Sequence, residues 1–200
     1  MRRWRFSGIE IKELIISWIA LSIIFSFPQL VQGSLLGLFL ILPTLGVGFI
    51  LHELGHKIVA QNYGFFAEYR MDPGNLMLAF LLILVTTLMG NPFVFAAPGA
   101  VMIYPVTAYG RTAGKEENGR ISIAGPIVNL GLCGVFLLLM LLTSSPFVLQ
   151  LAAIGLQVNS LLAVFNLLPF GPLDGAKIYG WSKGIWGSAV LLALFALTLG

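Results

Sequence analysis

Long apolar stretches separated by short polar segments run through the whole sequence. Five of these stretches are close to the roughly 20 apolar residues that an α-helix needs to cross a bilayer. We expect transmembrane helices at residues 14–31, 35–60, 121–142, 148–168 and 184–200. The pattern therefore predicts an all-α polytopic membrane protein with about five transmembrane helices.

A sixth apolar stretch, residues 75–90, is too short for a full span, and we expect it to be re-entrant. It is followed by Asn91-Pro92 and then by a run rich in β-branched and aromatic residues. That run continues to Tyr104 and contains the turn signal Pro98-Gly99. We therefore expect a short membrane-associated β-hairpin or an extended loop near the membrane, with a turn at Pro98-Gly99.

The composition agrees with a membrane protein. Hydrophobic residues make up 58% of the chain and charged residues only 10%, against about 25% charged in soluble domains. No polar segment is long enough for an independent soluble domain, so we expect residues 1–200 to form a single membrane-embedded domain. The basic residues are scattered, which argues against a nucleic-acid partner. Cys133 is the single cysteine, which excludes an internal disulfide and a cysteine-based metal site.

The distribution of basic residues predicts the orientation of the helices. Residues 1–12 are rich in arginine and lysine, so the positive-inside rule places the N-terminus in the cytoplasm. If residues 75–90 return to the side from which they enter, all 11 basic residues lie on the cytoplasmic side or at cytoplasmic helix ends. If they cross instead, the basic residues of 110–120 lie outside, and Asp174 lies on the opposite side from His52. The charge bias therefore favours the re-entrant arrangement.

The two histidines of the chain stand four residues apart, in the segment His52-Glu53-Leu54-Gly55-His56. Positions i and i+4 share one face of a helix, so both imidazoles can bind one zinc ion. Glu53 lies beside that face, where it can act as a general base on a water molecule. The simpler alternative is a pair of hydrogen-bonded polar residues inside a helix bundle. Ionisable side chains within a membrane are rare and tend to be functional, so we favour zinc.

A catalytic zinc usually has three protein ligands, so a third ligand is expected from another part of the chain. Six of the eight carboxylates lie in segments that we expect at the membrane edge or in the cytosol, and Glu53 is needed as the base. Asp174 remains, in a stretch broken by proline and glycine after the fourth span. An ordinary turn at the membrane surface would also explain Asp174. The second and fourth spans run in the same direction, however, and this brings Asp174 to the end where His52 lies.

Two further motifs accompany the His-Glu segment. They are Gly125-Pro126-Ile127-Val128-Asn129 and the segment from Asn166 to Gly175, with Pro169 and Asp174 at fixed spacing between them. Taken together and in this order, the three motifs resemble the site-two protease family of intramembrane zinc metalloproteases. The resemblance covers about residues 35–180, which we expect to be the catalytic core.

The resemblance implies a zinc metalloendopeptidase that hydrolyses peptide bonds within transmembrane segments, in regulated intramembrane proteolysis. It implies transmembrane protein substrates, a site opening toward the cytoplasm, and an extended stretch around Phe95–Tyr104 to which an unwound substrate adds as a strand. The implied site consists of one Zn²⁺ held by His52, His56 and Asp174, Glu53 as the catalytic base, and Asn166 and Asn129 as contacts to the substrate or the oxyanion.

Other function classes are also compatible with a polytopic membrane protein. A non-proteolytic membrane-protein binder or chaperone would keep the same fold without catalysis, but every expected catalytic residue type is present. A zinc transporter would need several acidic or histidine sites along a path, whereas this chain has one cluster.

Overall fold

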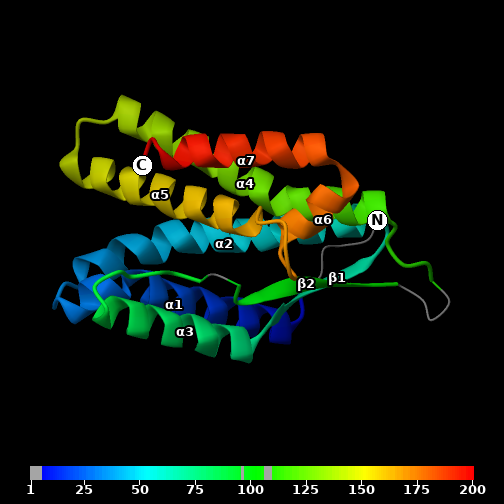
Figure 1. Ribbon diagram of the computed structural model, residues 1–200, viewed down its shortest axis with the longest axis horizontal. Helices are drawn as coiled ribbons and strands as arrows, with labels where there is room; N and C mark the ends of the chain where they lie inside the picture. Colours follow the sequence, from blue (N-terminus) through cyan, green and yellow to red (C-terminus); the bar gives the residue numbers. More distant parts are fainter. Residues whose placement is uncertain (1–5, 96, 106–109) are drawn as a thin grey trace.

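The computed structural model describes residues 6–95, 97–105 and 110–200. Helices dominate it, and a small sheet lies at one end (Figure 1). In chain order the elements are α1 (Gly8–Val31), α2 (Leu36–Asn62), β1 (Phe66–Met71), α3 (Pro73–Leu88), β2 (Gly99–Tyr104), α4 (Lys115–Leu142), α5 (Pro146–Asn166), α6 (Asp174–Trp181) and α7 (Lys183–Leu197).

Four of these helices are long and apolar enough to cross a membrane, namely α1, α2, α4 and α5. They correspond to the first four predicted spans. Helices α3 and α7 are apolar but shorter, with 16 and 15 residues, so the fifth predicted span stays a prediction. Helix α1 begins at Gly8, six residues before the apolar stretch, because Ser7 caps it by accepting a hydrogen bond from the Glu10 backbone N–H at 3.0 Å.

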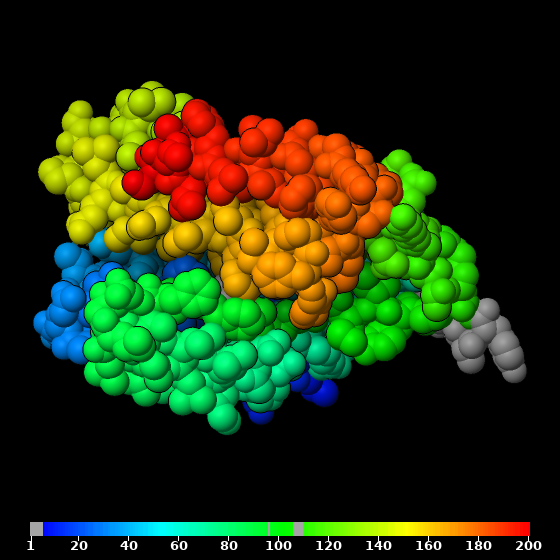
Figure 2. Space-filling model, viewed as in Figure 1, coloured from blue at the N-terminus to red at the C-terminus, as the bar shows by residue number. Residues whose placement is uncertain are grey.

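Helix α2, which carries the two histidines, lies at the centre of the molecule. It packs against α1 on one side and against α4 and α5 on the other. Half of the residues in the most apolar stretch of α2 are buried, the largest share among the four long helices. Helix α3 covers α1 and helix α7 covers α5, so these two short helices lie on opposite sides of the molecule (Figure 2). The histidine motif is therefore held by helices on both sides.

The sheet differs from the predicted hairpin. Strand β2 lies within the predicted extended stretch, but it pairs antiparallel with β1, from Phe66 opposite Tyr104 to Met71 opposite Gly99. The local hairpin with its turn at Pro98-Gly99 is therefore wrong. Pro98 instead accepts a hydrogen bond from the Asp72 backbone N–H at 2.8 Å, and the strand starts directly after it. A turn signal is local in sequence, whereas this pairing joins strands separated by a whole helix.

Helix α3 and the segment that follows it leave the sheet and return to the same place. Asp72 and Pro73 start the helix, and the Phe80 ring packs edge-on against Phe27 of α1 at 5.7 Å between centroids. Residues after α3 then run back beside the helix to β2 (Figure 1). The hydrogen bond between Asp72 and Pro98 joins the two ends of this excursion.

Candidate metal centre

Three predicted ligands meet in the interior, although Asp174 is more than a hundred residues from the two histidines in sequence. Asp174 Oδ2 lies 3.0 Å from His56 Nε2 and 3.4 Å from His52 Nε2, and the two Nε2 atoms are 3.0 Å apart. The three side chains are buried, with relative exposures of 4% for His52, 6% for His56 and 9% for Asp174. The potential ligand atoms all lie within 4.8 Å of one another, so one metal ion could contact all three.

The broken stretch before Asp174 delivers its carboxylate to the histidines. Helix α5 ends at Asn166, and the chain turns through Gly171, whose φ of 63° lies in the left-handed region that favours glycine. A second, short helix, α6, then begins at Asp174. The irregular backbone was expected from sequence, but the short helix that follows it was not.

Each imidazole is fixed by a hydrogen bond at the ring nitrogen that faces away from Asp174. His56 Nδ1 donates to the Ile121 carbonyl oxygen at 2.8 Å, and His52 Nδ1 lies 2.6 Å from Asn129 Oδ1. A carbonyl oxygen can only accept, so Nδ1 carries a proton in each ring, and Nε2 is the nitrogen that faces Asp174 and is placed to bind a metal. This is the usual arrangement of histidines that bind metals.

Asn129 is in turn held by two other helices. Its amide group donates to the Gly48 carbonyl at 3.2 Å and to Asn159 Oδ1 at 3.0 Å. Both donors are therefore used, and the Asn129 oxygen faces His52. Asn159 donates back to Gly155 at 2.8 Å. Sequence reasoning missed Asn159, although an asparagine within an apolar helix is itself a signal of an internal partner.

Gly125 explains the second sequence motif. A Cβ atom at this position would lie 2.5 Å from the Nε2 atoms of both His52 and His56, so only glycine fits. The absence of a side chain leaves space directly beside the two Nε2 atoms. Two nitrogen donors, one carboxylate and this space fit a zinc ion with an open coordination position.

Electrostatics favour the anionic form of Asp174. Burial alone would raise the pKa of this carboxyl group, but the nearby imidazoles of His56 and His52 outweigh burial and hold the pKa below its ordinary value. A carboxylate that stays ionised is a suitable ligand for a divalent cation.

Glu53 lies beside the ligands and faces a cavity of about 290 Å³. Its side chain is buried, and within the described residues its Oε2 atom has no hydrogen-bond partner. A buried oxygen atom without a hydrogen-bond partner destabilises the fold, unless it binds a water molecule or takes part in a reaction. The same cavity is lined by all three potential ligands and by Asn166 and Lys177. The Asn166 amide donates to the Leu162 carbonyl of its own helix at 2.9 Å.

The wall of the cavity opposite α6 is formed by β2. Residues 97–103 all line it without a gap. Because alternate side chains of a strand point to opposite faces, an unbroken run of lining residues means that the edge of the strand faces the cavity. Within the described residues β2 pairs with β1 alone. A strand edge with free hydrogen-bonding groups therefore lies beside the candidate metal centre.

Comparison with known proteins places the chain in a family. "Putative zinc metalloprotease MJ0611" of Methanocaldococcus jannaschii is 42% identical over 187 residues, which cover 93% of this chain and 91% of that protein. "Putative zinc metalloprotease YwhC" of Bacillus subtilis is 33% identical over 156 residues, 68% of this chain and 65% of that protein. "Zinc metalloprotease MJ0392" of M. jannaschii is 28% identical over the whole of this chain and 53% of its own length.

No family model matches the chain, and no solved structure is matched. The relatives share a name for an activity that agrees with the buried His52, His56 and Asp174 cluster. With 42% identity over nearly the full length of both sequences, this chain belongs to that family of zinc metalloproteases.

Proposed function

We propose that this zinc metalloprotease works inside the bilayer and hydrolyses peptide bonds within transmembrane segments of other proteins, as the site-two proteases do. One observation carries the proposal. The His52, His56 and Asp174 cluster is buried among helices that are themselves long and apolar enough to cross a membrane. A substrate that reaches this cluster through the bilayer would be a membrane-spanning segment.

The geometry supports a role for each residue of the site. His52, His56 and Asp174 are the zinc ligands. When bound, zinc polarises the scissile carbonyl and makes a water molecule more acidic. Glu53 accepts the proton of the attacking water on its carboxylate and later delivers a proton to the leaving amine. The buried Oε2 atom of Glu53 supports this role, because no other group in the described part of the chain donates a hydrogen bond to it.

The substrate lies between β2 and the segment before α6. An extended peptide placed there would pair with the strand edge and present a carbonyl group to the metal site. Asn166 lines this cavity, and its oxygen is available to orient the substrate or the groups around the oxyanion. Strand addition also explains how a helical segment becomes cleavable, since the peptide bond is exposed only after unwinding.

Asn129 has a different role from Asn166. It is fully buried, at 0% exposure, and its two amide hydrogens are already donated. Its oxygen lies against His52 Nδ1. These contacts support Asn129 as a residue that orients a zinc ligand rather than as a contact to the substrate or the oxyanion.

We also propose how the protein is oriented in the membrane. The N-terminus and the opening of the site face the cytoplasm, and α3 is re-entrant. The excursion of α3 supports this arrangement, because the chain returns to the sheet from which it leaves. The partners are then transmembrane protein substrates and the lipid bilayer itself.

A cleavage assay with purified protein tests the function. The protein is reconstituted in liposomes with a labelled model substrate whose scissile region lies in its transmembrane segment. The same sequence is also supplied as a soluble peptide. Wild-type protein with zinc should cut the transmembrane substrate, a chelator should stop cleavage, and added zinc should restore it.

The variant Glu53→Gln should keep zinc and lose at least about a thousandfold in cleavage rate, because the general base is removed. Lys115→Ala, at the exposed N-terminal end of α4, is the matched control and should cleave normally. Full activity of Glu53→Gln would refute the mechanism. Cleavage of the soluble peptide without cleavage of the transmembrane substrate would refute the intramembrane function.

A further inference from the structure

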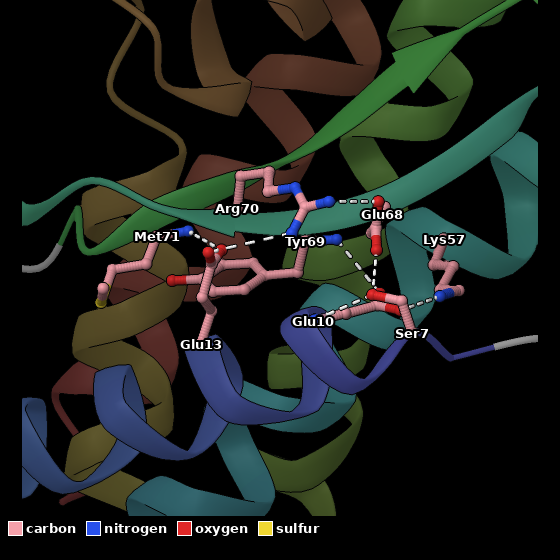
Figure 3. A network of polar contacts seen from close by, with 8 residues as sticks. All are labelled: Ser7, Glu10, Glu13, Lys57, Glu68, Tyr69, Arg70 and Met71. Carbon is pink, nitrogen blue, oxygen red and sulfur yellow. Dashed lines mark hydrogen bonds and ion pairs between the residues drawn. The ribbon is translucent and has the colours of Figure 1, made fainter.

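A two-stranded sheet has two outer edges, and in this protein one of them is already occupied. The Tyr69 backbone N–H donates to Glu10 Oε1 at 3.1 Å, and the Met71 backbone N–H donates to Glu13 Oε2 at 3.0 Å. Both carboxylates come from the first turns of α1 (Figure 3). The outer edge of β1 is therefore capped by side chains of a helix, while the outer edge of β2 faces the cavity.

The register shows which backbone groups of β2 face the cavity. In an antiparallel pair, residues that direct their N–H and C=O groups outward stand opposite each other. Tyr69 directs its N–H outward to Glu10 and stands opposite Val101. The N–H and C=O groups of Val101 therefore point to the outer edge of β2. Those of Ile103, two residues further along the strand, point the same way. Ala100 and Met102 direct theirs to β1.

The capping carboxylates are themselves held in place by ion pairs. Glu10 is 1% exposed and pairs with Lys57, which is 2% exposed and follows His56 directly on α2. Glu13 lies 3.8 Å from the Arg70 guanidinium. Figure 3 shows these groups around the start of α1. One network thus connects the helix that carries the histidines, the first helix and the sheet.

The ion pairs and hydrogen bonds of this network are not needed to hold α1 against α2. Helix α1 already packs on α2 through buried apolar residues such as Leu21 and Leu45. Buried carboxylates add little net stability by themselves. Glu10 and Glu13 instead satisfy backbone N–H groups of an edge strand, which would otherwise attract another strand.

We propose that Glu10 and Glu13 are positioning residues for the substrate: they close the β1 edge, so that an extended substrate pairs only with β2, through the backbone groups of Val101 and Ile103. The inference rests on the proposed function. It adds α1 to the substrate-binding apparatus, outside the catalytic core of residues 35–180 that the sequence motifs cover.

Kinetics on the reconstituted enzyme test the inference. Glu13 is only half-buried, so Glu13→Ala is the first variant. It leaves the Met71 N–H without an acceptor and frees the β1 edge. Substrate that pairs with the freed β1 edge is bound but not cleaved, so kcat and KM should fall together, each about tenfold, while kcat/KM and zinc content stay close to the wild-type values. Glu13→Gln retains an acceptor oxygen and should restore both kcat and KM. Glu116→Ala, on an exposed carboxylate of α4, is the matched control.

A second variant addresses the β2 edge directly. Val101→Pro removes the N–H group that faces the cavity, and proline is tolerated in a strand where its nitrogen points outward. Because this variant weakens the productive edge itself, KM should rise about tenfold while zinc content stays unchanged. Wild-type kcat and KM in Glu13→Ala would overturn the role of the capping carboxylates, and a wild-type KM in Val101→Pro would overturn pairing through the β2 edge; either result overturns the inference. Failure of the proposed function would show itself differently, because the wild-type enzyme would then leave the transmembrane substrate uncut.

Discussion

At the scale of single residues, the metal centre depends on an absent side chain. Gly125 lets α4 approach α2 so closely that a methyl group would lie 2.5 Å from both histidine Nε2 atoms. Gly125→Ala should therefore place carbon where the metal belongs. We expect zinc content below about a tenth of the wild-type value and a parallel loss of cleavage, because the overlap displaces a ligand. Metal analysis of the purified variant measures this.

Gly131→Ala provides the control for that experiment. Gly131 lies on the same helix, and no atom lies within 4 Å of a Cβ built there. Both variants change helix propensity in the same direction, so a general effect on α4 would appear in each. Full zinc occupancy in Gly125→Ala would show that the histidines bind the metal in another arrangement.

The chain of asparagines behind His52 predicts a graded effect on zinc affinity. Asn129 contacts the imidazole directly, whereas Asn159 acts through Asn129. Asn129→Ala should weaken zinc binding about 10–100-fold, the usual effect of losing the partner of a ligating histidine. Asn159→Ala should weaken it less. Competition with a chromogenic chelator measures both affinities, and a larger effect for Asn159→Ala would contradict this order.

Single residues also mark the limit of what sequence patterns predict. The ligands His52 and His56 follow from their spacing on one helix. Glu10 and Glu13 lie in a segment that the sequence pattern places at the membrane edge or in the cytosol. Glu10 is nevertheless among the most buried residues, since Lys57 neutralises it and the Tyr69 N–H satisfies it. Local sequence does not reveal a partner that lies 47 or 59 residues away.

At the scale of elements, the long helices were predictable and the short elements were not. A span is recognised from apolar length alone, and the first four expected ranges match α1, α2, α4 and α5. Strand β1 lies in a stretch of mixed polarity, so its sequence shows no clear period. It forms because α1 and β2 supply partners for both of its edges. Helix α6 follows a proline- and glycine-rich break that concealed it.

The ion pair between Glu10 and Lys57 fixes α1 to α2 and predicts a stability effect at this scale. Lys57→Met leaves a buried carboxylate without its counter-charge and should lower the free energy of unfolding by about 3–5 kcal/mol. Adding Glu10→Gln should restore most of the loss, because glutamine is neutral and still accepts from the Tyr69 N–H. Denaturation in detergent micelles measures both values. A single variant as stable as the wild type would show that the pair does not hold the helices together.

At the scale of the whole molecule, the site depends on helix direction. Helices α2 and α5 run in the same direction, so the segment after α5 brings Asp174 to His52 and His56. This was predictable from the parity of the spans. The direction of α4 relative to α2, however, depends on whether the segment between them crosses the membrane. The return of the chain from Asp72 to Pro98 favours an excursion that does not cross.

Cysteine labelling in intact cells tests this topology. Cys133 is buried and is first replaced by alanine, so that each new cysteine stands alone. A membrane-impermeant maleimide should label Ser34→Cys and Ser144→Cys, which lie in exposed turns after α1 and α4. It should label Asn62→Cys and Lys115→Cys only after the cells are permeabilised, because the proposed topology places both on the cytoplasmic side. Retained cleavage activity shows that each variant keeps the native arrangement.

Each topology gives its own labelling pattern. If α3 crossed the bilayer, Lys115→Cys would be labelled in intact cells and Ser144→Cys would be protected, while Asn62→Cys would stay protected. If the whole protein were inverted, Asn62→Cys and Lys115→Cys would both be labelled. The predicted pattern alone keeps the basic residues of α1 and of the segment before α4 in the cytoplasm. It also fixes the side from which water reaches Glu53, and hence the end of the substrate that is released there.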